Sequence, residues 1–122
     1  MLTLSSDFMK ARVKELFFSH GLTSAVEYQL PNGRRLDVAA FSATGSIAGV
    51  EIKTNVKDFN RDLKWPTYLA FCKVFYFAVP LGFPYDILPK RLGVIIVNNS
   101  SARILRGLSK TNRFPTSVLL RA

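Results

Sequence analysis

The chain has 122 residues, of which 48% are hydrophobic, so it is long enough for one domain with a buried core and too short for several. Its formal net charge is +9 at pH 7, which argues against an anionic surface and favours a polyanionic partner. A single cysteine, Cys72, and a single histidine exclude an internal disulfide and a metal centre built from these two residue types. We therefore predict one domain over residues 1–122.

The first part of the chain predicts one helix followed by three strands. Ser5 and Ser6 are helix-capping residues, and apolar residues then recur at helical spacing, so a helix is expected over about residues 6–19. Pro31-Asn32-Gly33 and Ala43-Thr44-Gly45 have the composition of tight turns. The alternating segments around them predict a three-stranded meander with strands at about 25–30, 34–41 and 46–53.

The later part predicts a helix, two buried strands and a further strand. Thr54-Asn55 supplies capping oxygens for a helix over Val56 to Trp65, and Pro66 bends or restarts this helix towards Phe71. Residues 80–89 are expected to form a loop with one helical turn. β-Branched and aromatic runs predict strands at 73–79 and 94–97, a late strand is expected at 102–106, and 116–120 forms a short element of either type.

The second meander turn brings two carboxylates together. A three-residue loop centred on Thr44 places Asp37 directly opposite Glu51, with Arg35 opposite Lys53. Two like charges on facing strand positions destabilise a sheet by themselves. A divalent cation between them would turn this repulsion into attraction.

A lysine completes a set of residues suited to phosphodiester hydrolysis. Glu51 and Lys53 are two positions apart on one strand, so both side chains point to the same face, while Val50 and Ile52 point to the other. Carboxylates bind Mg²⁺ or Mn²⁺, and a neighbouring lysine can orient water or neutralise charge in the transition state. Asp37, Glu51 and Lys53 are therefore the candidate catalytic residues, with Asp37 and Glu51 as metal ligands.

A third acidic ligand has two candidates. If the first turn is a three-residue loop centred on Asn32, Glu27 falls opposite Asp37 and joins its row. A two-residue turn at Asn32-Gly33 would instead place Tyr28 there and point Glu27 away; Pro31 favours the first version. Glu15 would reach the metal if the first helix packed beside the meander, although its basic neighbours favour a solvated helix face.

At this point the residues carry a resemblance. The order of helix, meander with Asp in its second strand and Glu-x-Lys in its third, helix and strand is similar to the core of the PD-(D/E)XK nuclease superfamily, the restriction-endonuclease-like α/β fold. Within it, the chain resembles the MmcB family of bacterial DNA repair proteins. The segments that carry this second resemblance are Gly33-Arg34-Arg35-Leu36-Asp37-Val38, Glu51-Ile52-Lys53-Thr54, Asp58-Phe59, Asp62-Leu63-Lys64-Trp65-Pro66-Thr67-Tyr68 and Phe75-Tyr76-Phe77-Ala78-Val79-Pro80. The resemblance implies a metal-dependent nuclease site at Asp37, Glu51 and Lys53 that acts on DNA.

Basic residues supply the expected contacts to DNA. Asp86 is the last acidic residue, and seven lysines and arginines follow it, which favours nucleic acid over the alternative of a basic face that only keeps the protein soluble. Asp58, Asp62 and Trp65 would lie on one stripe of the second helix, where Trp65 either stacks on a base or packs over the sheet. The candidate DNA-binding residues are Arg34, Arg35, Thr54, Asn55, Trp65, Arg103, Arg106, Lys110 and Arg113.

Three functions remain compatible with these residues. The first is a Mg²⁺- or Mn²⁺-dependent nuclease in DNA repair, the second a catalytically inactive nucleic-acid-binding module of the same fold, and the third an RNA-directed nuclease. A symmetric substrate such as a junction would favour a homodimer, although no interface signature is visible. Residues 1–7 lack the features of a signal peptide and Lys73 interrupts the most apolar stretch, so we expect a cytoplasmic protein without membrane contact.

Overall fold

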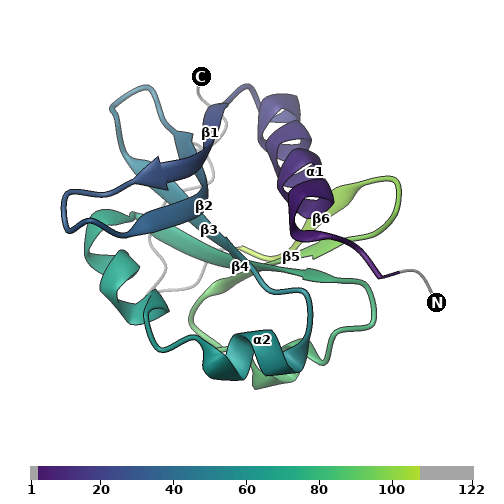
Figure 1. Cartoon of the computed structure of the whole chain (residues 1–122). Helices are drawn as coiled ribbons and strands as arrows, with labels where there is room; N and C mark the ends of the chain where they lie inside the picture. The colour runs from purple at the N-terminus through teal and green to yellow at the C-terminus, as the bar shows by residue number, and fades with distance from the viewer. Residues whose placement is uncertain (1–2, 108–122) are drawn as a thin grey trace.

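The computed structural model describes residues 3–107, which form a six-stranded mixed sheet with helices on both faces (Figure 1). The elements are α1 (Ser6–Ser19), β1 (Thr23–Gln29), β2 (Arg35–Phe41), β3 (Ile47–Ile52), α2 (Val56–Arg61), η1 (Trp65–Phe71), β4 (Val74–Pro80), η2 (Tyr85–Ile87), β5 (Gly93–Val97) and β6 (Ala102–Arg106), where η1 and η2 are 3₁₀ helices. The predicted fold class and element order are confirmed. The predicted element at 116–120 lies outside the described residues.

Strand order in the sheet follows chain order from β1 to β6. The meander β1–β2–β3 is antiparallel, β3, β4 and β5 are parallel, and β6 returns antiparallel to β5. A parallel neighbour needs a crossover connection, which α2 and η1 provide between β3 and β4. The carboxyl ends of β3 and β4 therefore lie side by side at one edge of the sheet.

Both meander turns have the predicted three-residue form. Val38 pairs with Val50 across β2 and β3 and with Val26 across β1 and β2, which is the register that loops centred on Thr44 and Asn32 require. Gly33 and Gly45 have φ values of 86° and 84°, the left-handed conformation that glycine adopts without strain. The two-residue alternative for the first turn is thereby excluded.

The sheet separates two apolar cores. On one face, α1 buries Met9, Val13 and Phe17 against alternate residues of the strands, among them Tyr76. On the other face, Phe75 and Phe77 pack with residues of α2 and η1. Of the helices within residues 3–107, none combines the length and the apolar character needed to cross a membrane.

The second helix is shorter than predicted. α2 ends at Arg61 instead of Trp65, because Asp62 adopts an extended backbone and its carboxylate accepts hydrogen bonds from the backbone N–H groups of Lys64 and Trp65. These bonds start η1, which then runs through Pro66. Asp58, Asp62 and Trp65 therefore do not share a helical stripe, and the prediction that they do is wrong.

Candidate active site

The candidate site lies where regular pairing between β2 and β3 ends. The ladder continues to Val38 and Val50, and beyond it the two carboxylates join the strands. The Asp37 N–H donates to Glu51 Oε1 at 3.1 Å, and the Ile52 N–H donates to Asp37 Oδ2 at 2.7 Å. Asp37 and Glu51 thus occupy the facing positions that the sequence predicts, and each carboxylate is fixed by a backbone donor of the opposite strand.

Burial makes this carboxylate pair costly to ionise. Glu51 is only 6% exposed. This burial, together with the nearby charge of Asp37, raises the pKa of the Glu51 carboxyl group to about 9. Burial also raises the pKa of Asp37, although its hydrogen bond from Ile52 and the charge of Lys10 act in the opposite direction. At neutral pH the pair therefore retains a proton unless a cation compensates its charge.

Lys53 shares the face of Glu51, as predicted, and is engaged by another acid. Val50 and Ile52 lie in the core on the α1 face, so the alternation of the strand turns Glu51 and Lys53 to the α2 face. Lys53 Nζ donates to Asp62 Oδ2 at 2.6 Å, and both side chains are largely buried. Burial alone would raise the pKa of Asp62, but the hydrogen bond from Lys53 and those from the η1 backbone lower it overall.

An open pocket of about 250 Å³ lies next to these groups. Its lining residues come from the end of β3, from α2, from the link between α2 and η1, and from the middle of η1; they are Glu51, Lys53, Asp58, Arg61, Asp62, Lys64 and Tyr68. Burial raises the pKa of Tyr68 to about 12, and the charges of Glu51 and Asp62 add to this effect. The Tyr68 phenol therefore keeps its proton and can donate a hydrogen bond to an anion in the pocket.

Glu27 lies opposite Asp37 in the register but turns to a different partner. Its φ of 51° interrupts the β1–β2 ladder, and its carboxylate accepts a hydrogen bond from Lys10 Nζ at 2.5 Å. The same contact raises the pKa of Lys10. The charge of Lys10 lowers the pKa of Asp37 and that of Glu27 raises it, each by less than burial does.

Glu15 is placed on the exposed side of α1, where its carboxylate accepts a hydrogen bond from Arg12 at 2.6 Å. This placement agrees with the alternative of a solvated helix face. Within residues 3–107, no three or more His, Cys, Asp or Glu side chains gather closely enough to hold a metal ion. Mg²⁺ is often held by only one or two carboxylates together with several waters, and the two oxygen donors Asp37 and Glu51 fit that manner of binding.

The predicted DNA contacts are distributed over several elements. Arg34 and Arg35 are exposed at the β1–β2 turn, and Arg103 is exposed on β6. Arg106 instead donates from Nε to the Leu92 carbonyl at 3.0 Å and from Nη2 to the Pro89 carbonyl at 2.9 Å, so part of its guanidinium holds the chain before β5. Lys110 and Arg113 lie outside the described residues.

Residues at the start of α2 are occupied with capping. The Thr54 hydroxyl and N–H donate to Asp58 Oδ2 at 3.5 and 3.1 Å, and Asn55 Oδ1 accepts from the Asp58 N–H at 2.8 Å. Trp65 packs edge to face on Phe77, with ring centroids 5.5 Å apart. All three side chains thus have structural partners in addition to any contact with DNA.

Lys10 and Tyr68 were not identified as site residues from the sequence, and Asp62 was predicted only on a helical stripe with Asp58 and Trp65. Lys10 reaches the site because α1 packs across the meander, and Tyr68 because η1 turns back over the sheet. No local sequence signal marks either contact. The i, i+9 relation of Lys53 and Asp62 likewise follows from the path of the chain after β3.

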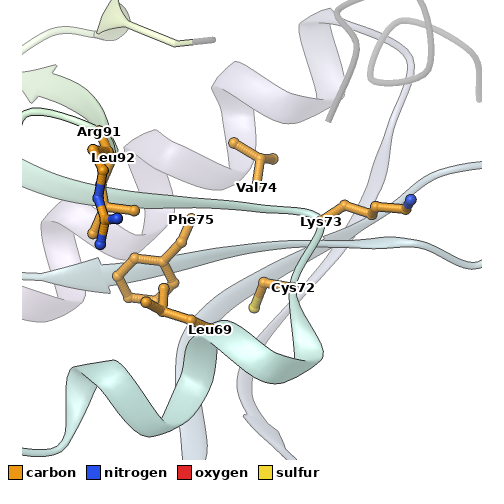
Figure 2. A pocket seen from close by; sticks show the side chains of 7 residues that line it. All are labelled: Leu69, Cys72, Lys73, Val74, Phe75, Arg91 and Leu92. Carbon is orange, nitrogen blue, oxygen red and sulfur yellow. The ribbon is translucent and has the colours of Figure 1, made fainter. Parts of the chain in front are cut away.

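A second pocket, of about 170 Å³, lies at the opposite end of the parallel strands (Figure 2). It is lined by Leu69, Cys72, Lys73, Val74, Phe75, Arg91 and Leu92. Cys72 directly follows η1, and burial raises the pKa of its thiol to about 12, which favours the protonated thiol at neutral pH. β4 begins at this pocket, whereas the carboxylate pair lies at the carboxyl end of β3; the two regions are therefore separate.

Comparisons with known proteins identify a family and a similar solved structure. The family described as DNA repair protein MmcB-like matches residues 5–117. Among solved structures, SPO1766, a protein of unknown function from Silicibacter pomeroyi, is similar with a TM-score of 0.77 and 31% sequence identity, over 98% of this chain and 84% of that chain. No curated protein matches the sequence.

Proposed function

We propose that this chain, which belongs to the MmcB-like family of DNA repair proteins, hydrolyses phosphodiester bonds in DNA with a divalent metal ion bound at Asp37 and Glu51. The observation that carries the proposal is the buried carboxylate pair. A binding protein gains nothing from two buried acids whose burial raises the pKa of both and which repel phosphate. A bound Mg²⁺ or Mn²⁺ would offset their repulsion, polarise the phosphate and lower the pKa of a bound water.

The surrounding residues have roles of their own in this proposal. Lys53, on the same face as Glu51, neutralises negative charge that develops on the phosphate. Asp62 holds the Lys53 ammonium at 2.6 Å and so fixes its position at the pocket. The Tyr68 hydroxyl, kept protonated, donates a hydrogen bond to a phosphate oxygen in the same pocket.

A catalytically inactive DNA-binding module is the second candidate, and one arrangement favours it. Lys53 and Glu27, two of the charged groups expected at the metal, are paired with Asp62 and Lys10. These two ion pairs account for the charged side chains without any catalytic role.

Cleavage of a panel of single-stranded, duplex, flap and junction DNAs with Mg²⁺ or Mn²⁺ separates these two functions, and an RNA strand in the same panel tests the RNA-directed alternative. We expect cleavage that stops in EDTA and is lost in Asp37→Asn and Lys53→Ala, while both variants keep most of their DNA affinity. Glu15→Gln is the matched control, because it removes an acid of α1 that pairs with Arg12 outside the site. Activity that persists in EDTA or in Asp37→Asn would reject the metal mechanism.

A further inference from the structure

Exposed apolar side chains are concentrated at the edge of the sheet that carries the candidate site. Six large apolar residues are exposed within residues 3–107, and four of them lie on the two connections that follow β3 and β4. These four are Leu63, Leu81, Tyr85 and Ile87, with 86%, 65%, 39% and 45% of their surface exposed. Single exposed apolar residues are ordinary, but a group on neighbouring loops beside a site indicates a binding surface.

Strand geometry puts both connections at the same edge as Glu51. Ile52 pairs with Ala78 in the parallel β3–β4 ladder, and the Lys53 N–H donates to the Ala78 carbonyl at 2.9 Å. The chain therefore leaves β3 and β4 at adjacent points, as Figure 1 shows for α2 and the green connection after β4. Both connections thus begin beside the strand end that carries Glu51.

The exposed residues after β4 are not needed to anchor their loop. Phe83 and Leu88 of the same segment are buried and join the core on the α2 face. The short helix η2 then holds Tyr85 and Ile87 outward, with the Ile87 N–H donating to the Pro84 carbonyl. The loop thus presents an aromatic ring and an aliphatic side chain on a fixed backbone.

Basic side chains accompany these apolar ones. On the connection after β3 the exposed cations are Lys57, Arg61 and Lys64, and Lys90 is exposed beyond η2. Two acids of the first connection already have partners within the protein: the Asp58 carboxylate accepts from the Thr54 N–H, and the Asp62 carboxylate accepts from Lys53 Nζ. Aromatic and apolar side chains bind the faces of unstacked bases, whereas cations bind the phosphates between them.

We propose that this edge binds DNA with unpaired bases, Tyr85 stacking on a base while Leu81 and Ile87 contact its neighbours, so that the adjacent phosphate reaches Asp37 and Glu51. The inference rests on the proposed nuclease function and narrows its substrate to single-stranded segments, such as those of flaps, gaps or splayed ends. In a closed duplex the base faces are stacked on one another and are not available to these side chains.

The test compares binding of the full chain to a single-stranded oligonucleotide and to a duplex of the same sequence, in EDTA so that neither is cut. We expect Tyr85→Ala to weaken single-strand binding by roughly fivefold to a hundredfold, as the loss of one stacked base does, and duplex binding by less than about twofold. Tyr85→Phe keeps the ring and should keep the affinity. Phe18→Ala, which removes an exposed aromatic ring of α1 outside the two connections, is the matched control.

The outcomes separate this inference from the nuclease proposal. The inference is overturned if Tyr85→Ala keeps its single-strand affinity or loses affinity equally for both DNAs, even if the wild type cleaves DNA. The exposed apolar residues would then be explained by contact with another protein. Absence of Mg²⁺-dependent cleavage together with a selective loss in Tyr85→Ala rejects the nuclease proposal and keeps the binding surface. A wild type that binds neither DNA overturns both.

Discussion

Replacing Glu51 with glutamine should make folding stability less dependent on pH. Glu51 is almost fully buried beside Asp37, and its pKa rises from an ordinary value of 4.5 to about 9. Glutamine has nearly the same size and keeps the Oε1 acceptor for the Asp37 N–H, but it carries no charge at any pH. Burial, the main cause of the raised pKa of Asp37, remains in this variant.

The sign follows from proton binding in the two states. Between pH 4.5 and about 9 the folded chain keeps a proton on Glu51 that the unfolded chain has lost. The free energy of unfolding therefore falls as the pH rises, by as much as about 1.4 kcal/mol per pH unit for one proton. Between about pH 6 and about pH 8 the free energy of unfolding of the wild type should therefore fall by as much as about 3 kcal/mol more than that of Glu51→Gln.

Urea unfolding in EDTA at a series of pH values measures this difference. When Mg²⁺ replaces EDTA, the metal should stabilise the wild type at about pH 8. The gain should be about 2.7 kcal/mol when the free metal concentration is 100 times its Kd, and much smaller for Glu51→Gln. Parallel pH profiles for the two proteins in EDTA would show that Glu51 ionises normally. The electrostatic reasoning behind the metal site would then be refuted.

Three further predictions concern the surroundings of the site. Lys53→Met leaves the largely buried Asp62 carboxylate without its 2.6 Å partner, so the free energy of unfolding in urea should fall by about 3 kcal/mol. The double variant Lys53→Met/Asp62→Asn should recover most of this loss, and equal stability of the single and double variants would contradict the reasoning. Gly49→Ala places a Cβ 2.6 Å from Cys72 Sγ and should lower the free energy of unfolding by about 1–3 kcal/mol, and adding Cys72→Ala should restore part of it. An unchanged urea midpoint would contradict the tight packing of η1 on β3. DNA affinity measured by fluorescence anisotropy should fall with salt, with a slope of about −0.9 in log K against log salt concentration for each phosphate contacted on duplex DNA, and a salt-independent affinity would exclude phosphate contacts by the basic residues.

Much of the fold and the centre of the site were determined by local sequence. Pro31 and Gly33 in the first turn and Gly45 in the second define three-residue loops, and a loop length sets the register of its hairpin. That register alone brings Asp37 to Glu51. The two-residue period of a strand then places Lys53 on the same face, and these relations hold because they depend on neighbours in the chain.

The partners of the charged groups were decided by tertiary structure. Lys53 meets Asp62 only because α2 stops at Arg61 and the chain turns into η1, and Glu27 meets Lys10 only because α1 packs across the meander. Helical spacing predicted a longer α2. Apolar periodicity carries no information on the hydrogen bonds by which the Asp62 side chain accepts from the backbone N–H groups of the residues that follow it. Sequence thus determined which charges share a strand face, whereas the packing of distant elements determined which of them are paired.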